Sequence, residues 1–162
     1  DVLVEPIDIS ENIQSRISQE FTLIFTGKSR SASSILSNSV VEGKSAIKNL
    51  QRIREQADEA KNHLNTGELS KLGSLLNEAW NMKRGISETV SNNFLDEMYS
   101  RIISTGATGA KLLGAGGGGF FLVHGSLEIR EKLELEFSPN CKMIPLNIDN
   151  IGSSIIHNDS HR

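Results

Sequence analysis

The residues with the clearest chemical potential in this 162-residue sequence are glycines. Residues 109–123 read GAKLLGAGGGGFFLV, and Gly116 to Gly119 are consecutive. Backbone amides without side chains can form a concave nest for an anion such as phosphate. Each added glycine costs roughly 0.5–1 kcal/mol relative to alanine, so this run indicates close packing against a backbone or a ligand. A phosphate-related role and a structural turn between two paired strands, residues 110–113 and 119–123, both remain open.

Two nucleotide-binding motifs are matched only in part. Three of the glycines satisfy G-x-G-x-x-G, but that fingerprint requires a strand before it and a helix after it, whereas FFLVHG is typical of a strand. The G-K-S at residues 27–29 resembles the end of a Walker A loop, yet Thr22 occupies the position of its opening glycine. We therefore expect neither site, and we interpret Lys28 as an ordinary loop lysine.

Composition argues against several further classes of function. The four histidines have no cysteine or carboxylate at metal-ligand spacing, so no protein-bound metal is expected. The net charge is -3, from 17 basic and 20 acidic residues, and 5% of residues are aromatic, so nucleic acid is not an expected partner.

The cellular setting follows from one cysteine and from the lack of long apolar runs. Cys141 cannot form an intrachain disulfide, and no stretch approaches the roughly 18 apolar residues that span a bilayer. We expect a reducing, cytoplasmic setting with no membrane contact and no signal peptide. The opening DVLVEPIDIS reads like the interior of a longer polypeptide.

The elements that must position the glycines alternate between helices and strands. Apolar spacing predicts helices over 43–64, from Leu69 to about Ile86, over 92–104 and over 126–137, with a short one over 31–36. Strands are predicted over 20–27, 110–113, 119–123, 142–150 and 152–158. Asn65 and Glu68 are expected to form a capping box, Ser91 to cap the helix that follows it, and Trp80 to pack in the core. This order predicts one α+β domain, residues 1–162, with a mainly antiparallel sheet.

The glycine segment resembles the third conserved motif of the GHMP kinases, the galactokinase, homoserine, mevalonate and phosphomevalonate kinase superfamily. KLLGAGGGG matches in order, and a helix before it and a strand after it match in context. LIFTGKSRSASSIL at 23–36 and residues 75–119 look like the branch that acts on D-glycero-D-manno-heptose 7-phosphate. Fucose and glucuronate kinases share parts of the pattern.

The resemblance implies the C-terminal domain of a two-domain kinase, a ferredoxin-like two-layer sandwich with a mainly antiparallel four-stranded sheet. The other, N-terminal domain of such kinases carries the ATP loop P-x-G-L-G-S-S and the catalytic aspartate. Neither occurs in this sequence, so the resemblance implies no catalytic residue here, an inactive isolated chain, and the N-terminal domain as a partner. ATP and Mg²⁺ would be bound mainly by that domain.

The implied reaction transfers the γ-phosphoryl group of ATP to the anomeric hydroxyl of the heptose phosphate, for nucleotide-heptose synthesis in surface polysaccharides. The resemblance places five residues near the nucleotide at the domain interface: Gly114, Ala115, Gly116, Gly117 and Gly118.

A phosphorylated acceptor needs cationic groups, and Lys83, Arg84 and Arg30 are the candidates. Lys83 and Arg84 could instead complement the negative end of their helix, and Arg30 could be a solvated loop residue. Lys111 could touch phosphate or point outward from its strand.

A hypothesis from another class also remains open. The chain could be a complete noncatalytic module of the ACT or ferredoxin-like kind that binds a small metabolite. The lack of a catalytic constellation favours this hypothesis, whereas the glycine run argues against it.

Overall fold

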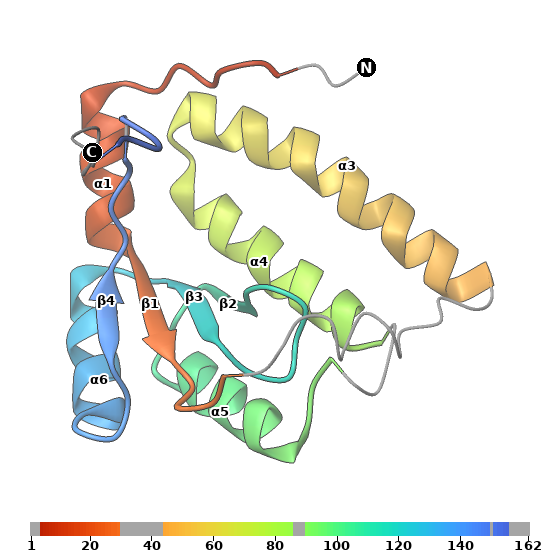
Figure 1. Ribbon diagram of the computed structural model, residues 1–162, viewed down its shortest axis with the longest axis vertical. Helices are drawn as coiled ribbons and strands as arrows, with labels where there is room; N and C mark the ends of the chain where they lie inside the picture. The colour runs from red at the N-terminus through yellow and green to blue at the C-terminus, as the bar shows by residue number, and fades with distance from the viewer. Residues whose placement is uncertain (1–3, 30–43, 86–89, 150, 156–162) are drawn as a thin grey trace, which may run out of the picture.

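The computed structural model describes residues 4–29, 44–85, 90–149 and 151–155 (Figure 1). Five helices and four strands lie in these ranges, in the order α1, β1, α3, α4, α5, β2, β3, α6 and β4. The short helix predicted over 31–36 and the candidate Arg30 lie outside them.

The four strands form one antiparallel sheet in the order β2-β3-β1-β4. They are β1 (Phe21–Phe25), β2 (Gly109–Leu112), β3 (Phe120–His124) and β4 (Met143–Pro145). The first and last of these four strands, β1 and β4, are neighbours, and the hairpin of β2 and β3 lies beside β1. With helices between β1 and β2 and between β3 and β4, this is the ferredoxin-like arrangement. The predicted α+β class and the antiparallel sheet are confirmed.

One face of the sheet carries the main core. Ile24 pairs with Phe121, which pairs with Leu112, so their side chains share a face, and all three are fully buried. Helices α5 (Asn93–Ser104) and α6 (Leu127–Phe137) cover this face. They contribute an apolar layer of Leu95, Met98, Ile102, Leu133 and Phe137.

The other face is covered less completely. Leu23, Leu122 and Lys111 share a row there, and all three are half-buried. Helix α4 (Leu69–Arg84) packs against β2, and α3 (Lys44–Thr66) packs against α4 (Figure 1). The fully buried Trp80 of α4 instead belongs to the main core, where it packs edge-on against Phe121, so the predicted core role of Trp80 is confirmed.

Several local expectations were wrong. Residues 11–20 form helix α1 (Glu11–Glu20), which was not predicted from the sequence, although Ser10 caps it and Ile13 and Ile17 repeat at helical spacing. Asn65 lies inside α3, and Glu68 makes no side-chain cap, so there is no capping box.

Two further expectations near the chain's second half differ from the structure. Asn92, not Ser91, caps α5 by accepting a hydrogen bond from the Leu95 amide, because only Asn92 occupies the N-cap position. The expected last strand is irregular over 152–155, where every residue is exposed. Those residues have no strand partner in the described sheet.

Candidate functional site

The loop between β2 and β3, residues 113–119, is held between two other segments by its backbone. The Gly117 amide donates to the Val90 carbonyl at 3.0 Å, just before α5. The Gly119 amide donates to the Lys28 carbonyl at 2.8 Å, just after β1. The loop therefore joins the ends of elements that are far apart in the sequence.

Glycine is required at these contacts because the backbones lie too close for a side chain. A β-carbon on Gly116 would lie 2.7 Å from the Val90 oxygen, and one on Gly118 would lie 2.7 Å from the Lys28 oxygen. Gly114, Gly116 and Gly117 also adopt positive φ angles of 75°, 119° and 74°. Close backbone packing, one of the two explanations for the glycine run, is therefore present.

The same loop keeps amide groups available. The amides of Gly114, Ala115, Gly116 and Gly118 donate no hydrogen bond to another described residue. Gly114 is exposed and Ala115 is half-buried, whereas the next three glycines are buried. An anion approaching the Gly114 end would meet N–H groups that donate to no described residue, as a phosphate nest requires.

Lys83 and Arg84 are neighbours in α4 but make different contacts. The Lys83 ammonium group donates to the Gly114 carbonyl, so this lysine reaches the glycine loop. Arg84 instead donates to the Asp96 carboxylate at 2.9 Å, and its guanidinium group lies 4.9 Å from the Tyr99 ring centroid. Arg84 thereby connects α4 to α5.

A polar cleft of about 820 Å³ lies where α4 ends and α5 begins. Its lining offers amide, hydroxyl and charged groups, the mixture that sugars and phosphates bind. The lining residues are Asn81, Arg84, Gly85, Ser91, Asn92, Asn93, Phe94 and Asp96.

The cleft adjoins the glycine loop through Val90 and through Lys28. The Lys28 ammonium group lies 4.1 Å from the centroid of the Phe94 ring. From the sequence, no role was predicted for Val90, Phe94 or Asp96, and Ser91 was expected only to cap the following helix. Only the cap signal expected at Ser91 pointed to this segment, because a carbonyl contact leaves no mark on residue type.

The charge of Asp96 is held in place by its neighbours. Burial alone would raise the pKa of this carboxyl, but hydrogen bonds from Arg84 and Ser91 outweigh that effect and lower it. The ionised carboxylate then keeps Arg84 in position at the wall of the cleft.

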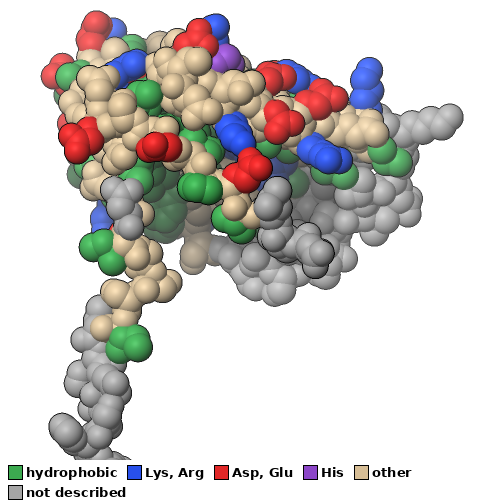
Figure 2. Space-filling view, turned by 90° about the horizontal axis from the view of Figure 1, so that it is seen from above, with side chains coloured by type: hydrophobic (Ala, Val, Ile, Leu, Met, Phe, Trp, Pro, Cys, Tyr) green, Lys and Arg blue, Asp and Glu red, His purple; other side chains and the backbone are tan. Residues whose placement is uncertain are grey.

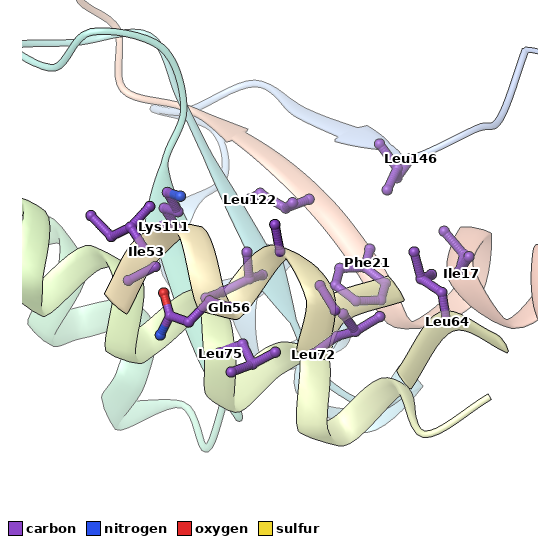
Figure 3. Close-up of a pocket in the computed structure, with 14 residues that line it drawn as sticks. Ile17, Phe21, Ile53, Gln56, Leu64, Leu72, Leu75, Lys111, Leu122 and Leu146 are labelled. Carbon is purple, nitrogen blue, oxygen red and sulfur yellow. The ribbon is translucent and has the colours of Figure 1, made fainter. Parts of the chain in front are cut away.

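A second cavity, of about 460 Å³, lies between the half-covered sheet face and helices α3 and α4 (Figure 3). Its lining is apolar apart from Gln56 and Lys111, and Figure 3 shows these two together with Ile53 at one end. Ile17, Leu64 and Leu146 lie at the other end (Figure 3). Lys111 therefore points toward this cavity.

Charged side chains elsewhere are mostly paired. Figure 2 shows acidic and basic groups intermixed on the face seen from above, and Arg52 of α3 binds both Glu59 and Glu78.

Within the described ranges, no group of three histidine, cysteine, aspartate or glutamate residues could hold a metal ion. None of the described helices has the length and apolarity to cross a membrane.

Comparison with family models gives a match over residues 46–137 to the C-terminal domain of the GHMP kinases. The match covers more than half of the chain. The chain belongs to the GHMP kinase family. The family assignment agrees with the glycine motif and with the fold.

Curated GHMP kinase relatives act on sugars. The chain is 32% identical over 123 residues to a D-glycero-alpha-D-manno-heptose 7-phosphate kinase from Campylobacter jejuni, covering 74% of this chain and 36% of that protein. It is 29% identical over 140 residues to a bifunctional fucokinase/GDP-fucose pyrophosphorylase from Arabidopsis thaliana, covering 81% of this chain and 13% of that protein.

Solved GHMP kinase structures share the fold. The L. major mevalonate kinase in complex with R-mevalonate has a TM-score of 0.65 at 21% identity, with 89% of this chain and 46% of that one covered. A putative sugar kinase from Campylobacter jejuni has a TM-score of 0.61 at 25% identity, with 90% of this chain and 41% of that one covered. The chain thus spans less than half the length of these relatives.

Proposed function

We propose that this chain is the C-terminal half of an ATP-dependent kinase that phosphorylates the anomeric hydroxyl of D-glycero-D-manno-heptose 7-phosphate. The observation that carries the proposal is the glycine loop, which is fixed by backbone contacts, has four amides that donate to no described residue, and is contacted by Lys83 at the Gly114 carbonyl. The heptose acceptor is supported by the Campylobacter relative. Kinase family membership favours this proposal over a noncatalytic metabolite-binding module.

In this proposal the chain binds and positions phosphate groups. Gly114, Ala115, Gly116, Gly117 and Gly118 line the path of the transferred phosphoryl group and face a nucleotide loop on the N-terminal domain. Lys83, Arg84 and Arg30 serve the phosphate of the acceptor. Phosphoryl transfer depends mainly on such positioning and on neutralising charge.

The remaining chemistry is assigned to the N-terminal domain, a partner outside these 162 residues. ATP would supply the phosphoryl group and Mg²⁺ would neutralise its charge, both held mainly by that domain. The base that accepts the hydroxyl proton would also lie in the N-terminal domain. We further propose that the enzyme is cytoplasmic.

The test is an acceptor panel with the full-length parent polypeptide. We expect ATP consumption with D-glycero-D-manno-heptose 7-phosphate and much less with the unphosphorylated heptose, fucose or mevalonate. A preference for fucose or mevalonate would contradict the acceptor assignment. Phosphoryl transfer by residues 1–162 alone would contradict the division of labour between domains.

A further inference from the structure

We propose that Lys83 and Lys111 together bind one phosphate group, at the place where α4 meets β2 beside the glycine loop. The inference deepens the proposed kinase function and rests on it for the identity of the ligand. This inference makes Lys111 a binding residue of the site. The group that the two lysines bind is a phosphate dianion.

Geometry brings the two lysines to one place. Lys83 is in the last turn of α4, and its ammonium group donates to the carbonyl of Gly114. Lys111 is in β2, three residues before Gly114, and its side chain lines the apolar cavity (Figure 3). Helix α4 packs directly on β2, and Lys83 and Lys111 lie close enough for the charge of Lys111 to act on Lys83.

The charges of this pair are not compensated within the described part of the protein. Arg52, Arg84 and Arg101 each contact a carboxylate within 3 Å. Lys83 and Lys111 form no ion pair with any described carboxylate, although both are half-buried. Burial lowers the pKa of both ammonium groups, and the charge of Lys111 lowers the pKa of Lys83 further.

Two half-buried like charges without a counter-ion are costly, and a bound anion would remove that cost. The negative end of α4 explains why one lysine is tolerated at position 83. It does not explain Lys111, which lies in a strand and faces an apolar cavity. A phosphate between the two ammonium groups accounts for both.

Gln56 offers a third donor at the same end of the cavity. Its side chain is only 5% exposed, and neither of its polar atoms makes a hydrogen bond of normal geometry to a described residue. Its carboxamide helps to lower the pKa of Glu78, but Arg52 already holds that carboxylate at 2.9 Å. A buried amide near Lys111 that has no hydrogen bond of normal geometry to a described residue is expected where a ligand completes the site.

The decisive experiment measures binding without turnover. The 162-residue chain is titrated calorimetrically with inorganic phosphate, with ATP and with D-glycero-D-manno-heptose 7-phosphate. Lys83→Met and Lys111→Met should each weaken binding of at least one of these ligands by about tenfold or more. The ligand most affected identifies the source of the phosphate, either nucleotide or acceptor.

Two control variants and a melting measurement separate this inference from a structural role. Lys142→Met removes an exposed lysine without a described ion pair, and its affinities should stay within about twofold of the wild type. Lys111→Arg keeps the charge and should retain most of the binding. Without ligand, Lys111→Met should melt at higher temperature than the wild type, because a half-buried repulsion is removed.

Unchanged affinity for all three ligands in both methionine variants would overturn the inference, and so would a lower melting temperature with unchanged affinity. If Lys111→Met does not fold, the inference is decided by Lys83→Met and by Lys111→Gln. Because turnover is not measured, a failure here leaves the acceptor-panel test of the kinase proposal intact.

Discussion

At the level of single residues, the glycine loop is shaped by carbonyl oxygens that approach glycine α-carbons. Gly118 is the simplest case, because its φ angle is not positive. Only the neighbouring atoms prevent a larger residue from occupying this position. The Lys28 carbonyl that blocks this space also accepts the Gly119 amide. A side chain here would separate β1 from the loop.

We predict that Gly118→Ala lowers the free energy of unfolding by about 1–3 kcal/mol, because a β-carbon 2.7 Å from the Lys28 oxygen forces the backbones apart. Urea unfolding measures the change. In the parent enzyme the same substitution should reduce turnover.

Gly85→Ala is the matched control. Gly85 has a φ of -76°, and its β-carbon would lie no closer than 3.4 Å to any neighbour. This substitution should be neutral or stabilising by up to about 1 kcal/mol, because it restricts the unfolded chain. Equal losses in both variants would contradict the close-approach argument.

At the level of elements, α1 is attached to the sheet through His124. The His124 Nε2 atom lies 3.1 Å from a Glu20 carboxylate oxygen, and the Gly125 amide donates to the Glu20 carbonyl at 2.9 Å. A carboxylate can only accept, so in neutral His124 the Nε2–H donates. This leaves the Nδ1 atom without a partner among the described residues.

We predict that stability falls as the pH drops below 6.5, in part through His124. Burial lowers the pKa of His124 below 6.5, and Glu20 opposes that shift only partly. The unfolded chain then binds the proton first, so acid favours unfolding. Urea unfolding at a series of pH values should show a shallower decline for His124→Gln, and an unchanged slope would contradict the prediction.

The turn between α3 and α4 carries a second titrating group. Glu68 receives hydrogen bonds from Lys71, His63 and Thr66, which lower its pKa to about 2. Because the folded-state pKa is lowered, the stabilising effect is present above pH 4.5 and disappears as the pH falls toward 2.

We therefore predict that Glu68→Gln is less stable than the wild type above pH 4.5 and that the difference disappears near pH 2. Thermal unfolding at several pH values tests this. Glu131→Gln, at an exposed position without a described ion pair, should show no such convergence. If Glu68→Gln were still less stable than the wild type near pH 2, the loss of stability would come from the geometry of the turn and not from the charge of Glu68.

At the level of the whole molecule, the two faces of the sheet differ in completeness. Helices α5 and α6 fill one face with fully buried side chains, whereas α3 and α4 leave an apolar cavity of about 460 Å³ over the other. Unfilled apolar space lowers stability, because the atoms that line it lose packing contacts.

We predict that Ala60→Leu raises the melting temperature, because it adds apolar volume inside this cavity. Asp58→Leu, at an exposed position on the same helix, should not raise it. Calorimetry measures both. A drop in melting temperature for Ala60→Leu would show that the cavity wall cannot accept a larger side chain.

Local periodicity allowed most of the fold to be predicted from the sequence. The stripes of α3, α4 and α5 and the alternation of β1, β2 and β3 depend only on neighbouring residues, so they are visible without coordinates. Helix α1 and the true cap of α5 were missed because short polar segments give weak signals. The family also followed from the sequence, because KLLGAGGGG is long and specific.

The tertiary structure decided what the glycines touch and how the cations are arranged. Val90 and Lys28 approach the loop through carbonyl oxygens, which every residue type carries, so no sequence pattern reveals them. Lys83 and Arg84 are adjacent in the sequence, yet one reaches Gly114 and the other Asp96, because consecutive helical side chains point in different directions. Lys83 and Lys111 come together only because α4 packs on β2, and such a long-range contact leaves no trace in local spacing.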